Sequence, residues 1–493
     1  MEYESIPKYA ILSHTWGEDE VTYKDIVKRP KEAALKRGYR KIKDCALQAL
    51  KDSIDYIWVD TCCIDKTSSS ELSEAINSMF RWYRDAHVCY AYLSDTPERL
   101  PGTDHRTWIS KFQASRWFTR GWTLQELIAP RSLQFYSGNW SQVGTKKDLS
   151  AAITARTGIP YEVVVSSDFS KASLAQRMSW AAGRSTSVRE DAAYCLMGLF
   201  DVNMPMLYGE GDNAFLRLQE EIIKKSDDMS IFAWVSSRAT FSAYRGLLAR
   251  STSDFSQCND IRWARWANNE PYQTTNKGIN ISLPLIAREG RPGEHIALLP
   301  GVYKKPNLEI GIFLQKVGEE QYARIETAQL AMPQMGPTGA SSSPVKFFVR
   351  QNIIMEAAGH ARAAGISLRV DAPGMEQLDV HPANRWDEGA KFLSFTVPTA
   401  VKKPPAVVFT FQPVGAFGSG MKITVDAGKP WKYVLGVDKN WSVSPVVSDF
   451  RHKIHCRRPR QPVIEVIAER GVFDGEAKIM LSVVALRNAD SPV

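Results

Sequence analysis

The chain has 493 residues, which is long enough for about three domains that each bury a core of their own. It carries 62 Lys and Arg residues against 54 Asp and Glu residues, and the net charge of +8 is spread along the sequence. A chain of this size needs no disulfide staples, and its mild basic excess permits an anionic ligand without demanding nucleic acid.

The cysteines and the N-terminal residues indicate a cellular compartment. Seven cysteines are an odd number, and most of them lie in apolar runs, so we expect reduced thiols in an intracellular protein. The opening "MEYESIPKYA" lacks the basic and apolar regions of a signal peptide. No stretch approaches the ~20 apolar residues of a membrane span. The prediction is a cytoplasmic or nuclear protein without a membrane anchor.

Residues 1–144 alternate short apolar runs with amphipathic stretches, which is typical of strands and helices around a parallel sheet. The expected strands are in "YAILSH", "DYIWVD", "HVCYAYLSD" and "SLQFYSG", and each ends in small polar residues. Apolar residues recur at helical spacing in "YRKIKDCALQALKDS" and "SELSEAINSMFRWYRDA". The serines before the second of these helices, together with Glu71, resemble a capping box.

Polar residues follow the expected strands at the edge where ligands bind to open α/β sheets. These residues are Ser13, His14, Asp60 and Asp95. The segment "SRWFTRGWTLQE", residues 115–126, is expected to join them. If "RGWTLQELIA" is helical, Trp122 and Glu126 are four residues apart and share one face.

The remaining sequence changes character twice. Residues 145–240 are expected to be mainly helical, because apolar positions recur at helical spacing in "DLSAAITARTGI", "SLAQRMSWAAGR", "EDAAYCLMGLFDV" and "NAFLRLQEEIIKKS". Residues 241–493 contain alternating β-branched and aromatic runs such as "INISLPLIA" and "KIMLSVVALR", which predict a mostly β domain.

Three blocks of the first domain resemble the fungal heterokaryon incompatibility (HET) domain. They are "YAILSHTWGEDEVTYKDI", "IWVDTCCIDKTSSSELSEAINSMFRWYRDAHVCYAYLSD" and "SRWFTRGWTLQELIAPRSLQFYSGNW". "AQRMSWAAGR" and "EDAAYCLMGLFDVNMPMLYGEGDNAFLRLQEEIIKKSDDMSIFAW" resemble the helical segment that commonly trails it. The resemblance covers about the first half of the chain. One departure lies in "RSTSVRED", where Val188 replaces the second arginine of the family's usual Arg-x-Thr-Thr-Arg-x-Glu-Asp.

The HET domain is in turn similar to the Toll/interleukin-receptor (TIR) fold, whose enzymatic members cleave NAD at the nicotinamide ribosyl bond. This similarity implies an α/β flavodoxin-like N-terminal domain with a helical extension, ahead of the mostly β C-terminal domain. Those enzymes place a catalytic glutamate after a tryptophan in a Ser-x-Trp-Cys-x-x-Glu pattern. "RGWTLQE" offers Trp122 and Glu126, with a spacing one residue longer and Thr123 in place of the cysteine. By this fold analogy Glu126 is the expected catalytic residue.

The residue types suit such a reaction. Nicotinamide is already cationic in NAD and needs no general acid, so the developing oxocarbenium ion requires one negative group and ordered ribose hydroxyls. Aromatic faces stack on the rings, and arginines pair with the pyrophosphate. The side chains expected to bind NAD or a related nucleotide are Ser13, His14, Trp16, Asp60, Arg116, Arg120 and Trp122.

Several of these residues have a purely structural alternative. Trp122 is as readily a core residue as a stacking partner, and Glu126 beside two arginines could form a surface ion pair worth ~0 to 1 kcal/mol. His14 could cap a helix or be a hydrogen-bonded core histidine.

Other chemistries have weaker support. Cys62 or Cys63 could be a nucleophile with His14 as base, but adjacent cysteines on a strand point to opposite faces. No metal is predicted, because the chain has no Cys-x-x-Cys or His-x-x-x-His pair, and Asp60 with Asp65 would hold Mg²⁺ only with help from a bound phosphate. The basic tract at 451–460 is expected to be a solvated loop, and no nucleic-acid partner is predicted.

Three functions therefore remain open. The first is a HET protein that binds and cleaves NAD in non-self recognition and cell death. The second is a repurposed HET-like enzyme of a fungal secondary-metabolite pathway, a cyclase or cycloaddition catalyst acting on a terpenoid or polyketide held in an aromatic pocket. The third is a non-enzymatic interaction module that self-assembles or binds an incompatibility partner protein.

Overall fold

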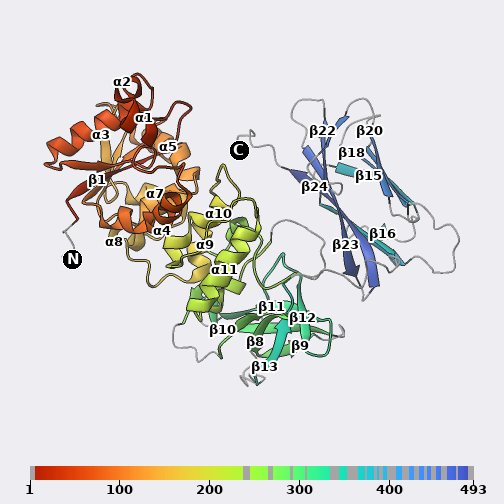
Figure 1. Ribbon diagram of the computed structural model, residues 1–493. Coiled ribbons are helices and arrows are strands. Elements are labelled where there is room, and N and C mark those ends of the chain that lie inside the picture. The colour runs from red at the N-terminus through yellow and green to blue at the C-terminus, as the bar shows by residue number, and fades with distance from the viewer. Residues whose placement is uncertain are drawn as a thin grey trace.

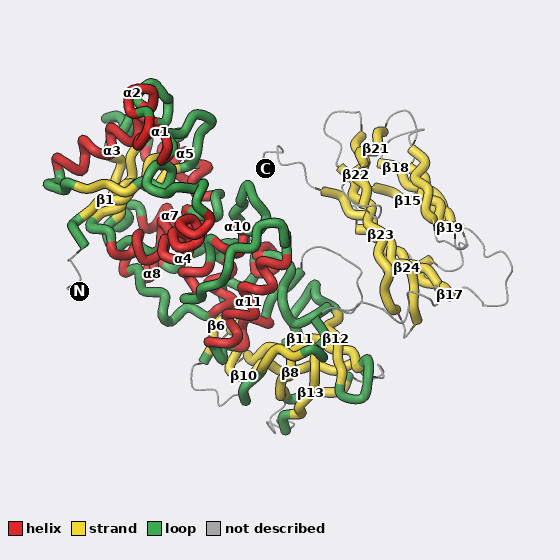
Figure 2. Tube along the Cα trace, viewed as in Figure 1, coloured by secondary structure: helices red, strands yellow, loops and turns green. Residues whose placement is uncertain are grey.

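The computed structural model describes residues 6–351 with their side chains, apart from 237–244, 265–269, 289–292, 306–307 and 333–342, and describes backbone strands between 365 and 486 (Figure 1). Figure 2 shows helices concentrated in the first half of the chain and strands in the second half. The order of these regions along the chain agrees with the periodicity of the sequence.

A five-stranded sheet organises the N-terminal region. Its strands are β1 (Tyr9–His14), β2 (Tyr56–Trp58), β3 (Val88–Tyr92), β4 (Leu133–Tyr136) and β5 (Gln142–Thr145), in the order β2-β1-β3-β4-β5. The first four strands are parallel, and the four predicted strands are confirmed. β5 runs antiparallel to β4. The order is that of flavodoxin-like sheets, but the reversed β5 departs from them, and membership of that class stays a prediction.

Both faces of this sheet are buried. Ala10 and Leu12 of β1 pack into one apolar core, and Ile11 packs into the other. The helices and the 3₁₀ turn of this region are α1 (Tyr23–Lys28), α2 (Pro30–Ala33), α3 (Tyr39–Lys51), α4 (Ser69–Asp85), α5 (His105–Ala114), η1 (Arg116–Thr119) and α6 (Thr123–Ile128). A parallel sheet covered on both faces explains why its strands are continuous apolar runs.

The two predicted amphipathic helices are α3 and α4 and are confirmed. Half of the expected capping box is present, because the Ser68 hydroxyl accepts a hydrogen bond from the Glu71 amide at 3.3 Å. The Glu71 carboxylate instead accepts from the Asp65 amide at 2.8 Å. Glu71 therefore fastens the loop that leads from β2 into α4.

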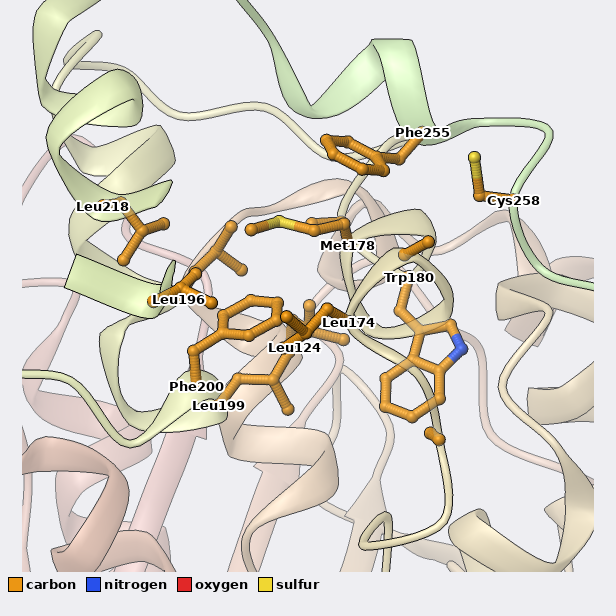
Figure 3. Close-up of a cluster of buried hydrophobic side chains, with 14 of the residues drawn as sticks. Leu124, Leu174, Met178, Trp180, Leu196, Leu199, Phe200, Leu218, Phe255 and Cys258 are labelled. Atoms are coloured by element: carbon orange, nitrogen blue, oxygen red, sulfur yellow. The ribbon is translucent and has the colours of Figure 1, made fainter. Parts of the chain in front are cut away.

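The helical segment packs directly on α6. Its elements are α7 (Ser150–Thr157), α8 (Tyr161–Ser166), α9 (Leu174–Ser179), α10 (Asp191–Tyr194), η2 (Met197–Phe200), α11 (Asn213–Lys225) and η3 (Met229–Phe232). Figure 3 shows Leu124 of α6 next to Leu174 of α9, with Leu199 and Phe200 of η2 nearby. One buried apolar cluster therefore includes both the α/β sheet and the helices.

The same cluster extends into a first β region. After η4 (Thr252–Phe255), its strands are β6 (Arg262–Trp263), β7 (Gln273–Thr275), β8 (Gly278–Leu283), β9 (Leu285–Ala287), β10 (Glu294–Lys305), β11 (Leu308–Lys316), β12 (Gln321–Ile325) and β13 (Val345–Val349). They form one sheet in the order β6-β10-β11-β12-β13-β8-β7, with β9 paired to β10. The buried Arg324 of β12 donates to the carbonyls of Phe232 and Trp234 and joins this sheet to the helices.

The C-terminal strands form two further sheets. They are β14 (Gly365–Asp371), β15 (Met375–His381), β16 (Trp386–Asp387), β17 (Phe392–Thr396), β18 (Val407–Pro413), β19 (Met421–Asp426), β20 (Lys432–Val437), β21 (Trp441–Pro445), β22 (Arg451–Cys456), β23 (Val463–Phe473) and β24 (Glu476–Leu486). One sheet has the order β16-β17-β14-β24-β23-β22-β21, and the other has the order β15-β18-β19-β20. The basic tract was expected to be a loop, but its first six residues form β22, paired with β21 and β23.

Gly198 of η2 tests the contact between the helical segment and α4. A Cβ at this position would overlap the Cβ of Phe80, whereas a Cβ at Gly183 would meet no atom within 4 Å. We expect Gly198→Ala to destabilise the protein by about 1–3 kcal/mol, because a tightly packed core resists added volume. Urea unfolding measures the change, with Gly183→Ala as the matched control. Equal midpoints for the two variants would contradict this packing.

Candidate functional site at the ends of β1 and β2

The site begins where two neighbouring parallel strands end. Ile11 of β1 pairs with Trp58, the last residue of β2, so Ser13 and Asp60 each follow this pair by two residues. Ser13 and His14 are the last residues of β1, and both are buried. The topology of the sheet therefore brings together three of the predicted side chains.

Glu126 is buried beneath this edge, with an exposed fraction of 5%. Its Oε2 accepts a hydrogen bond from the Ser13 hydroxyl at 2.5 Å, and that hydroxyl accepts from the Trp117 indole at 2.8 Å. Burial, reinforced by the charge of Asp60, raises the pKa of Glu126 to about 8. The alternative of a surface ion pair is therefore wrong, and the carboxyl group is mainly protonated at neutral pH.

Five buried polar atoms of residues at and around the ends of β1 and β2 make no hydrogen bond to any described residue. They are Nδ1 and Nε2 of His14, Oε2 of Glu20, Oδ1 of Asp60 and Oγ1 of Thr61. His14 Nδ1 lies 3.7 Å from Asp60 Oδ1, and His14 Nε2 lies 4.0 Å from Glu20 Oε2. Both separations exceed hydrogen-bond length, so His14 is buried as a core histidine would be, but its ring makes no hydrogen bond to the described residues.

The charges at these atoms are set mainly by burial. Burial, with the nearby positive charges of Lys41 and Lys66, holds the pKa of His14 well below its ordinary value. Burial also raises the pKa of Asp60. Because buried polar groups in folded proteins are nearly always hydrogen-bonded, a cluster of unbonded ones calls for an additional partner such as water, an ion or a ligand.

An aromatic ring and cations border these atoms. Trp16 is 48% exposed, and its indole N–H donates a hydrogen bond to Asp60 Oδ2 at 2.8 Å. The Lys66 ammonium lies 3.5 Å from the centroid of the Trp16 ring, and partial burial lowers its pKa. Lys41 pairs with Glu20 at 2.5 Å. Trp16 and Lys66 therefore present an aromatic surface and a positive charge at the outer side of the cluster.

Arg116 lies beside Trp16. Its guanidinium donates to the Thr15 hydroxyl at 3.2 Å and to the Trp16 carbonyl at 3.3 Å. Its backbone amide donates to the carboxylate of Asp95, which also accepts from Ser115 at 2.6 Å. Asp95 therefore fastens η1, while Arg116 remains next to the candidate site.

Arg120 and Trp122 make contacts in another direction. The Trp122 indole donates to Asp191 at 3.0 Å, and Asp191 also accepts from Tyr208 at 3.1 Å. Arg120 donates to the Ser187 hydroxyl at 3.1 Å. These partners belong to the helical segment, so the segment 115–126 contributes to two different environments. Glu126 and Arg116 lie near the ends of β1 and β2, whereas Arg120 and Trp122 contact the helices.

Sequence reasoning missed Arg184, which hydrogen-bonds the residues at the start of α6. The guanidinium donates to the Arg120 carbonyl and to the Thr123 hydroxyl, both at 2.9 Å. Burial lowers the pKa of Arg184 to about 10, and its positive charge acts to lower the pKa of Glu126. Arg184 is the first residue of the motif "RSTSVRED", which is visible in the sequence, but nothing in the sequence indicates that this residue contacts α6.

The two adjacent cysteines lie in a turn. Cys62 and Cys63 follow β2, which ends at Trp58, and the amides of both donate to the Val59 carbonyl. The expectation that they alternate along a strand is therefore wrong, because β2 is shorter than its apolar run. Asp65 is turned toward Thr67, and within the described residues no group of three or more His, Cys, Asp or Glu side chains is placed to hold a metal ion.

Glu126→Gln tests the environment of the buried carboxyl group. A folded-state pKa of about 8, against an ordinary 4.5, means that the folded protein binds this proton more tightly than the unfolded chain. Stability is therefore lost as the pH rises between these two values, at about 1.4 kcal/mol for each unit of pKa difference. We expect Glu126→Gln to gain thermal stability relative to the wild type as the pH rises from about 4.5 to about 8. Thermal melts measure this gain.

The control for this experiment is Glu162→Gln, which changes an exposed glutamate on α8. Its melting temperature should follow that of the wild type at every pH. Parallel curves for the wild type and Glu126→Gln would show instead that the carboxyl group has an ordinary pKa.

Comparisons with known proteins match the region that contains the ends of β1 and β2. A family model described as heterokaryon incompatibility protein (HET) matches residues 9–102, which contain β1, β2 and β3. A domain of unknown function (DUF8212) matches residues 213–290. None of the helices in the described part of the chain is long and apolar enough to cross a membrane.

One curated relative matches over a longer range. The vegetative incompatibility protein HET-E-1 of Podospora anserina is 51% identical over 223 residues, which cover 44% of this chain and 16% of the relative. The chain therefore spans a small part of the length of that protein. No solved structure matches. The family match and the identity to this relative together identify residues 9–102, which contain β1, β2 and β3, as a HET domain.

Proposed function

We propose that the HET domain binds NAD or a related nucleotide at the ends of β1 and β2, cleaves the nicotinamide ribosyl bond, and thereby acts in heterokaryon incompatibility. The unbonded polar atoms of His14, Glu20, Asp60 and Thr61 carry this proposal. They offer acceptors from two carboxylates, a donor and an acceptor from the imidazole, and a hydroxyl. Such a set matches a sugar with vicinal hydroxyl groups.

The border of the site suits the other parts of a dinucleotide. The exposed indole of Trp16 can stack on an aromatic base, with Lys66 moving from the ring to a phosphate. Arg116 adds a second cation next to Trp16. Because a planar guanidinium binds phosphate oxygens in a bidentate manner, Arg116 suits the pyrophosphate. Arg120 and Trp122 contact the helical segment and supply no support for this pose.

The carboxyl groups suit the bond cleavage. Nicotinamide needs no protonation to leave, so the developing positive charge on the ribose requires a negative partner. Glu126 is mainly neutral when the site is empty, because its pKa is about 8. A cationic ring nearby would favour the ionised form, and the proton of Glu126 would be released on binding. Water then replaces nicotinamide on the ribose and gives ADP-ribose.

The role in incompatibility is supported by the relative. The matched protein of Podospora anserina is named a vegetative incompatibility protein, and 44% of this chain aligns with it. Loss of NAD would harm a cell after non-self contact. The similarity to TIR enzymes is part of this proposal and supplies the assignment of Glu126 as the catalytic carboxylate.

Incubation of the purified full chain with NAD tests the activity. We expect release of nicotinamide, measured by chromatography, and a loss of about 100-fold or more in kcat for Glu126→Gln, because a group that stabilises transition-state charge has an effect of this size. Asp60→Asn should mainly raise KM, because Asp60 is assigned to hold the ribose. Glu162→Gln is the control for an exposed carboxylate and should keep full activity.

The outcomes separate the proposed functions. Nicotinamide release that Glu126→Gln leaves unchanged would remove Glu126 from the mechanism. The absence of turnover and of NAD binding would refute the proposal. Assembly on addition of a partner protein would then favour a non-enzymatic module, and binding of an apolar terpenoid or polyketide would favour the biosynthetic alternative.

A further inference from the structure

The turn after β2 holds two thiols next to the candidate site. The amides of Cys62 and Cys63 donate to the Val59 carbonyl at 3.2 and 2.8 Å, and the Val59 amide donates back to the Cys63 sulfur at 3.3 Å. Cys63 is exposed, and Cys62 is half-buried. The thiol of Cys62 is close enough to the sulfur of Cys63 to affect its ionisation. The same turn carries Asp60 and Thr61 of the candidate site.

The other described cysteines lie in a different environment. Cys45, Cys89, Cys195 and Cys258 are all buried. Burial raises the pKa of Cys45 and of Cys258 to about 12. The neighbouring Cys62 thiol, together with the hydrogen bond from the Val59 amide, lowers the pKa of Cys63 to about 7. Because the thiolate is the reactive form of cysteine, Cys63 combines the exposure and the ionisation that the buried thiols lack.

We propose that Cys62 and Cys63 form a reversible redox switch, in which a hydroperoxide oxidises Cys63 and Cys62 closes a disulfide that distorts the turn carrying Asp60 and Thr61. Cys63 is the attacked residue because it is the exposed cysteine and its sulfur receives a hydrogen bond from the Val59 amide. Cys62 is the resolving residue because it is the adjacent cysteine in the same turn.

The chemistry needs only a peroxide as oxidant. The Cys63 thiolate attacks one peroxide oxygen, and the O–O bond breaks to give the sulfenic acid and hydroxide, which takes up a proton and becomes water. The Cys62 thiol then attacks the sulfenic sulfur, the S–O bond breaks, and a second water leaves. The protein loses two hydrogen atoms overall, and a thiol reductant returns them by thiol–disulfide exchange.

The proximity of the two residues in sequence makes this disulfide strained. Adjacent Cα atoms lie about 3.8 Å apart across a trans peptide, whereas disulfides usually join Cα atoms about 4.4–6.8 Å apart. The turn must therefore deform when the bond forms, and Cys63 must give up the hydrogen bond from the Val59 amide. Strained and exposed disulfides are readily reduced, which suits a reversible switch.

The deformation has a direct consequence for the candidate site. Asp60 holds the Trp16 indole and faces His14, so a shift of the turn changes the position of both carboxylate oxygens. We expect oxidation to weaken nucleotide binding. This last step rests on the proposed function, whereas formation of the disulfide does not.

The experiment treats the reduced full chain with hydrogen peroxide and maps its peptides by mass spectrometry. We expect the peptide with Cys62 and Cys63 to lose two hydrogen atoms at least about tenfold faster than Cys45 or Cys258 react, and dithiothreitol to reverse the loss. Cys62→Ser should stop at a sulfenic acid on Cys63 that dimedone traps. Cys63→Ser should form no bond within this peptide. Cys45→Ala, which removes a buried thiol, should behave as the wild type.

Hydrogen exchange supplies a readout that needs no ligand. Amides in residues 59–68 should exchange faster after oxidation, and the change should be absent in Cys63→Ser. The proposed switch would be overturned if Cys63 were oxidised no faster than the buried thiols. It would also be overturned if the wild-type protein accumulated a stable sulfenic acid on Cys63 without forming a disulfide to Cys62.

NAD binding then separates the two proposals. If the disulfide forms but the protein does not bind NAD, the proposed nucleotide function is refuted and the proposed redox switch is retained. Equal NAD affinity of the reduced and oxidised forms would overturn the coupling between the turn and the site.

Discussion

The geometry of this site depends on a carboxyl group buried under the end of a central strand. Among the described residues no cation forms an ion pair with Glu126, and its burial is made tolerable by the hydrogen bond from the Ser13 hydroxyl and by the raised pKa that lets it keep its proton. The position of the carboxyl group is set from below, since Leu124, Leu127 and Ile128 fix α6 in the apolar core. The Glu126 carboxyl group therefore cannot be displaced by a shift of α6 unless the packing of the apolar core is also disturbed.

The unbonded atoms above Ser13 place a second constraint on the protein. Each buried polar atom without a partner costs free energy, and His14, Glu20, Asp60 and Thr61 contribute five of them in one place. Two large apolar cores on either side of the sheet supply the stability that offsets this cost. A polar cluster that weakens the free protein is a common property of binding sites, where a ligand completes the hydrogen bonds.

The sequence predicted the parts of this arrangement that follow from local periodicity. The apolar runs located β1 to β4, and the rule for strand ends brought Ser13 and His14 together with Asp60. It did not predict Glu20, Lys41 or Lys66, because these lie in a loop, on a helix and after a turn, and only the folded chain brings them together. It also could not assign Trp122 to Asp191, since a contact between residues so far apart has no periodic signature.

The helical segment is fastened directly to the α/β sheet region. Arg184 bonds the backbone of Arg120 and the hydroxyl of Thr123, and Asp191 holds Trp122, so both ends of the turn into α6 are fastened by residues beyond 144. The family model stops at residue 102, before η1, α6 and Glu126. The match with the incompatibility protein runs over 223 residues, more than twice that range. A fragment that ended with the sheet would keep Ser13 and Asp60 but lose Arg184, whose charge opposes the raised pKa of Glu126, together with the helices that pack against α6.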